Sequence, residues 1–300
     1  MTGAGRPYRY SPITTRPSGT WPGEKSLAVY ICVGVEDYRF GDGLTEDILP
    51  GVAAPDFVNT SWRDYGNRVG AFRLFERMAR LGMRPTVLLN TDVYDTAPEV
   101  VEAARGAGAE FVAHGLTNSD TLEGRAPADE RDYLSRVAAR IKHEEGTAPG
   151  GWSSPWLTHT VSTISSLSET GYRYLLDLRL DDQPVWLTGT PEPLLAIPYN
   201  LEINDSSSVV GRGASAHDFA QMIIDEFDEL LDASKDAPLV MTIVVHSFVS
   251  GVPFRLRALT RALEHIAAHG DRVWMTTPGD IHRFVVDNPA LFPIEPEPAT

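Results

Sequence analysis

This chain alternates short apolar segments with longer segments of helical spacing, and that alternation limits the folds open to it. Residues 26–35 and 238–245 are short runs rich in Val and Ile or Leu, as buried strands are. In segments such as 65–81, 129–145 and 214–231, apolar residues recur every three or four positions, as in helices that cover a sheet. The pattern predicts an α/β fold with a parallel sheet. At this length, the simplest closed arrangement of these strands and helices is a distorted (β/α) barrel of about seven parallel strands.

An open, doubly wound sheet is the alternative arrangement of such elements. That fold usually carries a glycine-rich phosphate loop after a strand, and the sequence has none. We therefore expect residues 26–288 to form a single catalytic barrel domain. Residues 1–25, which are rich in Pro, Gly and Arg, are expected to form an extended N-terminal arm, and residues 289–300 a disordered tail.

Composition narrows the possible partners. The 26 basic and 41 acidic residues give a formal net charge of −15, which disfavours nucleic acid as a partner. No segment approaches the roughly 18 apolar residues of a membrane-spanning helix, and residues 1–25 lack the apolar run of a secretory signal. The single cysteine, Cys32, excludes an internal disulfide. We expect a cytoplasmic protein that acts on a small molecule, without a membrane partner.

Charged and polar residues directly follow several of the predicted strands. Glu36 and Asp37 follow the first strand, His114 follows residues 110–113, and His246 follows residues 238–245. In a (β/α) barrel the carboxyl ends of the strands open on one face, which carries the active site. We expect these residues to meet there, together with Asp182 and Glu202. For Asp177, Asp181 and Asp205 a purely structural role at the start of a helix stays equally open.

The order of these residues resembles the polysaccharide deacetylase superfamily over about residues 11–281. The resemblance is carried by the segments WPGEKSLAVYICVGVEDYRFG, SWRDYGNRVGAFR, EFVAHGLTNS, GWSSPW, GYRYLLDLRLDDQPVWL, IPYNLEINDSS and VVHSFVSGVPFRLRAL. Within the superfamily the chain looks closest to the allantoinase-like branch, which includes cofactor-free allantoinases and cyclic imide hydrolases. The resemblance implies a distorted barrel and a homo-oligomer, a tetramer in related enzymes.

The chain departs from the family pattern at the residues that hold a metal. The family has an Asp-Asp pair, base and metal ligand, where this chain has Glu36-Asp37. The second histidine of the family's His-x-x-x-His motif is Asn118 here, and an arginine of the family is Ser153. The resemblance thus implies either no cofactor or one divalent metal, most simply zinc, held by Asp37, His114 and Asn118. Asparagine is a poor zinc ligand beside histidine.

The resemblance also implies the chemistry, because both branches hydrolyse a carbonyl–nitrogen bond. Glu36 is the predicted base, with a pKa raised by burial, and His246 the predicted acid, with an ordinary pKa of about 6.5. His114 is expected to bind a metal or polarise the carbonyl. Asp182 is expected to orient His246 or bind a substrate N–H. The predicted substrate-binding residues are Trp152, Trp156 and Trp186, which would form a flat wall for a ring, with Asp182, Glu202 and Asn204.

The function expected from these residues is hydrolysis that opens the ring of a small cyclic amide, imide or ureide. Two alternatives stay open. One is a metal-dependent N-deacetylase of an amino sugar or polysaccharide. The other is a barrel that binds a ligand without catalysis; packing in the core remains an alternative role for each tryptophan.

Overall fold

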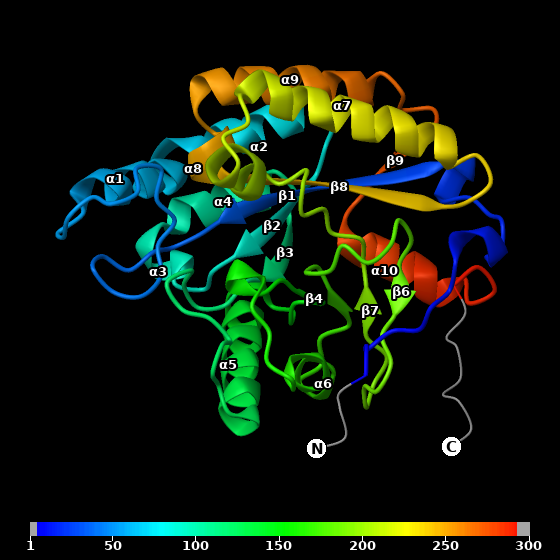
Figure 1. The fold of residues 1–300 in the computed structure, drawn as a ribbon, viewed down its shortest axis with the longest axis horizontal. Coiled ribbons are helices and arrows are strands. Elements are labelled where there is room, and N and C mark those ends of the chain that lie inside the picture. Colours follow the sequence, from blue (N-terminus) through cyan, green and yellow to red (C-terminus); the bar gives the residue numbers. More distant parts are fainter. Residues whose placement is uncertain (1–4, 293–300) are drawn as a thin grey trace.

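One curled, mostly parallel sheet forms the centre of the protein in a computed structural model that describes residues 5–292 (Figure 1). The strands lie in the order β6-β7-β5-β4-β3-β2-β1-β8, and β9 also pairs with β1. All pairs are parallel except β6 with β7. The strand bounds are β1 Leu27–Val35, β2 Pro85–Leu89, β3 Glu110–Ala113, β4 Gly151–Trp152, β5 Tyr174–Leu175, β6 Val185–Trp186, β7 Leu195–Ala196, β8 Leu239–His246 and β9 Val273–Met275.

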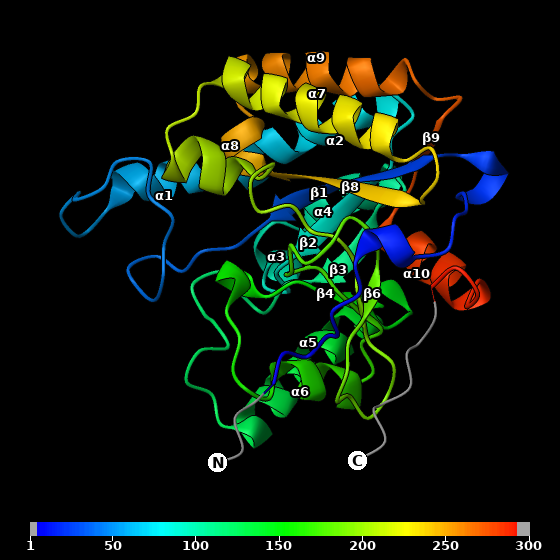
Figure 2. The ribbon, with the colours of Figure 1, turned by 45° about the vertical axis from the view of Figure 1, so that its right-hand side comes forward.

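Helices cover the outside of this sheet. Figures 1 and 2 show α2, α7 and α9 together along one side of β1 and β8. The α-helices are α1 Phe57–Tyr65, α2 Ala71–Arg80, α3 Val93–Thr96, α4 Pro98–Gly106, α5 Pro127–Glu145, α6 Thr163–Glu169, α7 Ala216–Ala233, α8 Ser247–Ser250, α9 Pro253–Ala267 and α10 Pro278–Asp287. Short 3-10 turns are η1 Ile13–Thr15, η2 Pro22–Glu24 and η4 Pro155–Leu157, and π-helical turns are η3 Gly66–Gly70 and η5 Ser206–Gly211.

The side chains of β1 alternate between two layers. Odd positions, such as Leu27 and Ile31, belong to the core that the helices cover, whereas even positions, such as Tyr30 and Cys32, belong to a second core inside the curl of the sheet. All nine residues of the strand are buried. A strand buried on both faces reads as a continuous apolar run, which explains why the sequence marks β1 and β8 so clearly.

Backbone contacts close most of the gap between β8 and the β6–β7 end of the sheet. The amide of Val240 donates to the Asp182 carbonyl at 2.8 Å, and the amide of Val244 donates to the Ile203 carbonyl at 2.9 Å. The predicted distorted (β/α) barrel is therefore confirmed. The sequence did not predict the antiparallel strand β6 or the short helices α3 and α8, because segments of two to four residues are too short to show periodicity.

Both ends of the described chain pack on the barrel. Trp21, in the predicted N-terminal arm, is 1% exposed, stacks on Phe292 and donates to the Leu239 carbonyl at 2.8 Å. Leu291 and Phe292, in the predicted disordered tail, are thus packed here, and Phe292 is buried because Trp21 offers it an aromatic face. Residues 293–300 of that tail lie outside the described residues. Between residues 5 and 292 no helix combines the length and apolar character needed to cross a membrane.

Candidate active site

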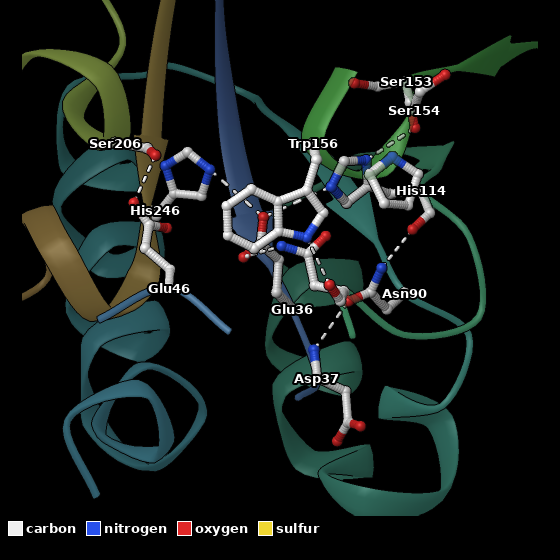
Figure 3. Close-up of polar contacts among 12 residues, drawn as sticks. Glu36, Asp37, Glu46, Asn90, His114, Ser153, Ser154, Trp156, Ser206 and His246 are labelled. Atoms are coloured by element: carbon white, nitrogen blue, oxygen red, sulfur yellow. Dashed lines mark hydrogen bonds and ion pairs between the residues drawn. The ribbon is translucent and has the colours of Figure 1, made fainter. Parts of the chain in front are cut away.

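Three strands bring Glu36, His114 and His246 together at the carboxyl end of the sheet (Figure 3). The Glu36 Oε1 atom lies 3.5 Å from Nε2 of His114 and 3.4 Å from Nε2 of His246. All three side chains are buried. Figure 3 shows the two imidazoles on opposite sides of the Glu36 carboxylate. Of the six residues predicted to meet at one face of the barrel, these three do so.

The alternation of β1 and β8 explains why Glu36 and His246 meet. Glu36 continues the even positions of β1, which point into the curl of the sheet. His246 continues the even positions of β8, and the strand register places it opposite Gly34. A Cβ atom on Gly34 would lie 2.6 Å from the His246 ring and 3.2 Å from Glu36 Oε1. Glycine at this position therefore leaves the space that both side chains occupy.

Asp205 holds the His246 ring from behind. Its carboxylate lies 2.7 Å from His246 Nδ1 and also accepts the His246 backbone amide and the Ser250 hydroxyl. A carboxylate at Nδ1 fixes that proton and turns Nε2 toward Glu36. Burial lowers the pKa of His246, but the carboxylates of Glu36 and Asp205 outweigh it and raise the pKa well above its usual value. The sequence predicted an ordinary value, so this expectation was wrong.

The Glu36 carboxylate is held by donors on both oxygens. Oε2 accepts the Tyr38 hydroxyl at 2.7 Å and the Asn118 amide at 3.1 Å. Burial raises the pKa of Glu36, but the positive charge of His246 and hydrogen bonds from His114 and His246 hold it well below its usual range. The predicted raised pKa was therefore wrong in direction, because the histidines outweigh desolvation. Glu36 and His246 face each other as carboxylate and imidazolium.

His114 is oriented by the backbone of the loop that follows β4. Its Nδ1 atom lies 2.8 Å from the carbonyl of Ser153, which only accepts, so Nδ1 carries a proton and Nε2 faces Glu36. The Asn90 side chain braces the same region, because it accepts the Asp37 amide at 2.9 Å and donates to the His114 carbonyl.

A π-helical turn supports Glu36 from the side of α1. Within η3, the Asn67 amide donates to the Glu36 carbonyl at 2.8 Å. Extra residues in such a wide turn redirect a side chain, and π-turns are frequent at functional sites. Gly70 allows the turn to approach the residues after β8, because a Cβ there would lie 2.0 Å from the Ser247 carbonyl oxygen.

The side chains predicted to bind a metal do not converge. The Asp37 carboxylate accepts the Thr96 hydroxyl at 2.9 Å, on the outer side of the strand end, because Asp37 has the opposite parity to Glu36. The amide nitrogen of Asn118 points to Glu36, and no partner contacts its buried Oδ1 atom. Within residues 5–292, no cluster of three His, Cys, Asp or Glu side chains is arranged to hold a metal ion. The donor set of this chain thus does not fit the implied zinc.

Of the three predicted tryptophans, the structure places only Trp156 at the site. Its indole nitrogen donates to the Asn118 carbonyl at 2.7 Å, and its ring lies in front of Glu36 in Figure 3. Trp152 is fully buried and packs edge-on against Tyr172, with ring centroids 5.4 Å apart. Trp186 belongs to the antiparallel strand β6, and its indole donates to the Phe292 carbonyl. Trp152 therefore packs in the core, and Trp186 is partly buried against the second core.

The predicted polar substrate-binding residues also lie elsewhere. The Asp182 carboxylate accepts Arg179 at 2.9 Å, and the contact with His246 expected of it is made by Asp205. The Glu202 side chain is 67% exposed and faces Arg212. The Asn204 side chain accepts the Ser206 amide at 3.0 Å and so shapes the turn that presents Asp205. Long loops carry these residues, and strand periodicity does not indicate where their side chains point.

Sequence reasoning missed three groups at the site. They are Asp205, which stayed open as a capping residue, Tyr38, and the buried carboxyl of Glu46 (Figure 3). Tyr38 could have been found from the sequence, because it lies two positions after Glu36 and so has the same parity. Glu46 lies ten positions beyond Glu36 in an irregular segment, and the sequence carries no periodic signal for it.

Known proteins resemble this chain in both sequence and structure. No family model matches the chain. It is 26% identical over 302 residues to a Schizosaccharomyces pombe protein named as a polysaccharide deacetylase, covering 89% of this chain and 91% of that one. It is 25% identical over 271 residues to the peptidoglycan deacetylase of Helicobacter pylori, covering 80% of this chain and 91% of the relative.

Solved structures agree with these relatives. The crystal structure of Puue allantoinase matches with a TM-score of 0.83 and 25% identity, over 91% of this chain and 95% of that one. A Pseudomonas aeruginosa PAO1 structure named as a polysaccharide deacetylase matches with a TM-score of 0.79 and 27% identity, over 90% of this chain and 94% of that one. Relatives and structures of nearly full length thus point to one family, as the sequence motifs do. This chain therefore resembles the polysaccharide deacetylase superfamily in both sequence and fold.

Proposed function

We propose that this protein hydrolyses a non-peptide carbon–nitrogen bond and opens the ring of a small cyclic amide, imide or ureide. The similar proteins are named as deacetylases and as an allantoinase, and both kinds of enzyme add water across a carbonyl–nitrogen bond. The observation that carries the proposal is the row Asp205–His246–Glu36. It pairs a base with an acid without drawing on the unassembled metal ligands.

The proposed reaction uses one water molecule. Glu36 takes a proton from the water, whose oxygen then bonds to the ring carbonyl carbon. His114 supplies a donor to the resulting oxyanion when its Nε2 carries a proton. The carbon–nitrogen bond breaks as His246 gives its Nε2 proton to the departing nitrogen, and the proton on Glu36 then returns to His246. The product carries a carboxyl group where the ring was closed.

Two features favour a compact ring over an acetylated sugar. The buried Oδ1 atom of Asn118 has no partner and can accept a ring N–H, which would remove the cost of leaving it unpaired. The flat indole of Trp156 lies beside it and suits a planar ring. Metal-dependent deacetylation is the second candidate, which the names of the sequence relatives favour.

Two neighbouring variants distinguish the candidates. Glu36→Gln removes the base, and Asp37→Asn removes the carboxylate that the family pattern gives to the metal while sparing Glu36. Metal-free ring opening predicts that Glu36→Gln lowers kcat by about 10³-fold or more and Asp37→Asn by less than about threefold. Turnover of succinimide, hydantoin, dihydrouracil, allantoin and N-acetylglucosamine oligomers is followed by mass spectrometry. Equal losses in both variants, with deacetylation of the oligomers, would favour the metal-dependent reaction.

A further inference from the structure

One buried carboxyl beside the site has no part in the reaction described above. Glu46 is 8% exposed, and its Oε1 atom accepts the Ser206 hydroxyl at 2.5 Å. Ser206 follows Asp205 directly, so Glu46 reaches the side of the site that holds His246. Figure 3 shows the Glu46 carboxyl beside Ser206 and His246, with His114 on the opposite side of Glu36.

The segment 39–49 holds Glu46 by contacts on two sides. On the side of β3, the amides of Arg39 and Leu44 donate to Ser119 at 2.9 and 3.0 Å. On the other side, Arg63 donates to the Glu46 carbonyl at 2.8 Å and pairs with Asp47. The segment therefore contacts Ser119 on one side and Ser206 on the other. Between these contacts it crosses the end of β1, which carries Glu36.

Nothing in the described chain neutralises the Glu46 carboxyl directly. No Lys or Arg of residues 5–292 forms an ion pair with it, because the Arg63 guanidinium pairs with Asp47 instead. Burial raises the pKa of Glu46, and His246 and the Ser206 hydroxyl offset that effect only in part. Glu36 and Asp205 add two nearby negative charges. This shift favours the neutral form of the carboxyl, whose O–H group is a hydrogen-bond donor.

We propose that Glu46 determines specificity by hydrogen-bonding the second carbonyl, the one that is not attacked, of a ring with two carbonyls. This inference rests on the proposed ring opening. Cyclic imides and ureides carry a second carbonyl at a fixed position in the ring, whereas an acetamido group has a methyl group and no second carbonyl. With the attacked carbonyl at Glu36, the other side of a small ring faces His246 and Glu46. Glu46 does not touch the reacting atoms, so it acts on binding and not on the chemical step.

The test compares two rings that differ only in this carbonyl, succinimide and 2-pyrrolidinone, in which a methylene replaces it. Binding is measured by calorimetry for the protein with wild-type Glu46, Glu46→Met and Glu46→Gln, each also carrying Glu36→Gln so that succinimide is not opened during the titration. We expect the wild type to bind succinimide about 10–100-fold more tightly than 2-pyrrolidinone, the usual effect of one buried hydrogen bond left unmade. Glu46→Met should lose this preference, and Glu46→Gln should keep most of it because an amide also donates. KM for succinimide should rise in Glu46→Met with kcat changed by less than about threefold.

Asp42→Asn is the matched control, because Asp42 lies on the same segment with a side chain that is 76% exposed. If Glu46→Met does not fold, Ser206→Ala replaces it and should weaken the preference several-fold by releasing the carboxyl. The role of Glu46 is overturned if Glu46→Met still prefers succinimide to 2-pyrrolidinone, or if Glu46→Gln loses this preference to the same extent. Neither result contradicts ring opening. A wild-type protein that binds neither ring overturns both proposals.

Discussion

Asp205→Asn tests whether the charge behind His246 sets the acid of the reaction. The carboxylate is fully buried and receives the His246 backbone amide, His246 Nδ1 at 2.7 Å and the Ser250 hydroxyl at 2.5 Å. An asparagine fits the same space, and its amide group can turn toward Ser250, whose hydroxyl can accept. The contact to Nδ1 then persists as a neutral hydrogen bond.

The magnitude follows from the loss of charge. A hydrogen bond to a charged group contributes about 1.5–3 kcal/mol, and a neutral one about 1 kcal/mol. If the imidazolium of His246 is less stable by about 1–2 kcal/mol, its pKa falls and kcat on the alkaline side should fall roughly 5–30-fold. The direction in which the pH profile of kcat shifts also follows from the loss of charge. His246 acts while protonated, and removal of one of its two carboxylates lowers its raised pKa, so the alkaline limb of kcat moves to lower pH.

Ser250→Ala is the matched control, because it removes one hydrogen bond from Asp205 and leaves the charge in place. Both variants should lower the free energy of unfolding by about 1.5–3 kcal/mol in chemical denaturation. Only Asp205→Asn should also change kcat and the pH profile of ring opening, measured by mass spectrometry. An Asp205→Asn protein with wild-type kcat and an unmoved alkaline limb would refute the reasoning.

Four further outcomes are expected. Tyr38→Phe removes a donor from the Glu36 carboxylate, so the pKa of Glu36 rises, the acidic limb of the pH profile moves to higher pH, and kcat falls about tenfold; an unmoved limb counts against this. In the wild type, the lowered pKa of Glu36 and the raised pKa of His246 predict a broad plateau of kcat around neutrality, and a narrow optimum would contradict it. Gly43→Ala places a Cβ 2.1 Å from the Ser119 carbonyl oxygen at a φ of +74°, so KM should rise and the melting temperature fall; unchanged values would show that the segment is not tightly held. Dialysis against a chelator should leave ring opening unchanged, and loss of activity restored by zinc would contradict the metal-free reaction.

Strand periodicity made much of the fold and part of the site predictable. β1 and β8 are apolar throughout and end at Glu36 and His246, so their adjacency in a parallel sheet places the two residues together. Glu36 and Asp37 are adjacent and have opposite parity, so their side chains point to opposite sides of the strand end. The family pattern hid this difference because it assigns both positions to the site. Alternation along β1 was therefore a better guide to Asp37 than the resemblance.

Irregular segments explain most of what the sequence did not reveal. Asp205 precedes its partner His246 by a π-turn, a long helix and a strand, and an acidic residue in a loop is equally typical of a helix cap. Trp186 belongs to a two-residue antiparallel strand that reverses the direction of the chain. The direction of the pKa shifts depended on both histidines facing one carboxylate oxygen, and spacing in the sequence does not specify that geometry.

The central claim is that water adds to a ring carbonyl through Glu36 and His246, without a metal. It is tested most directly by incubating the chelator-treated wild-type protein with succinimide in water labelled with oxygen-18, beside Glu36→Gln. Mass spectrometry should show the ring opened with one labelled oxygen in its new carboxyl group, in the wild type only. An unchanged ring in the wild type, with release of labelled acetate from N-acetylglucosamine oligomers after zinc is restored, would contradict the account.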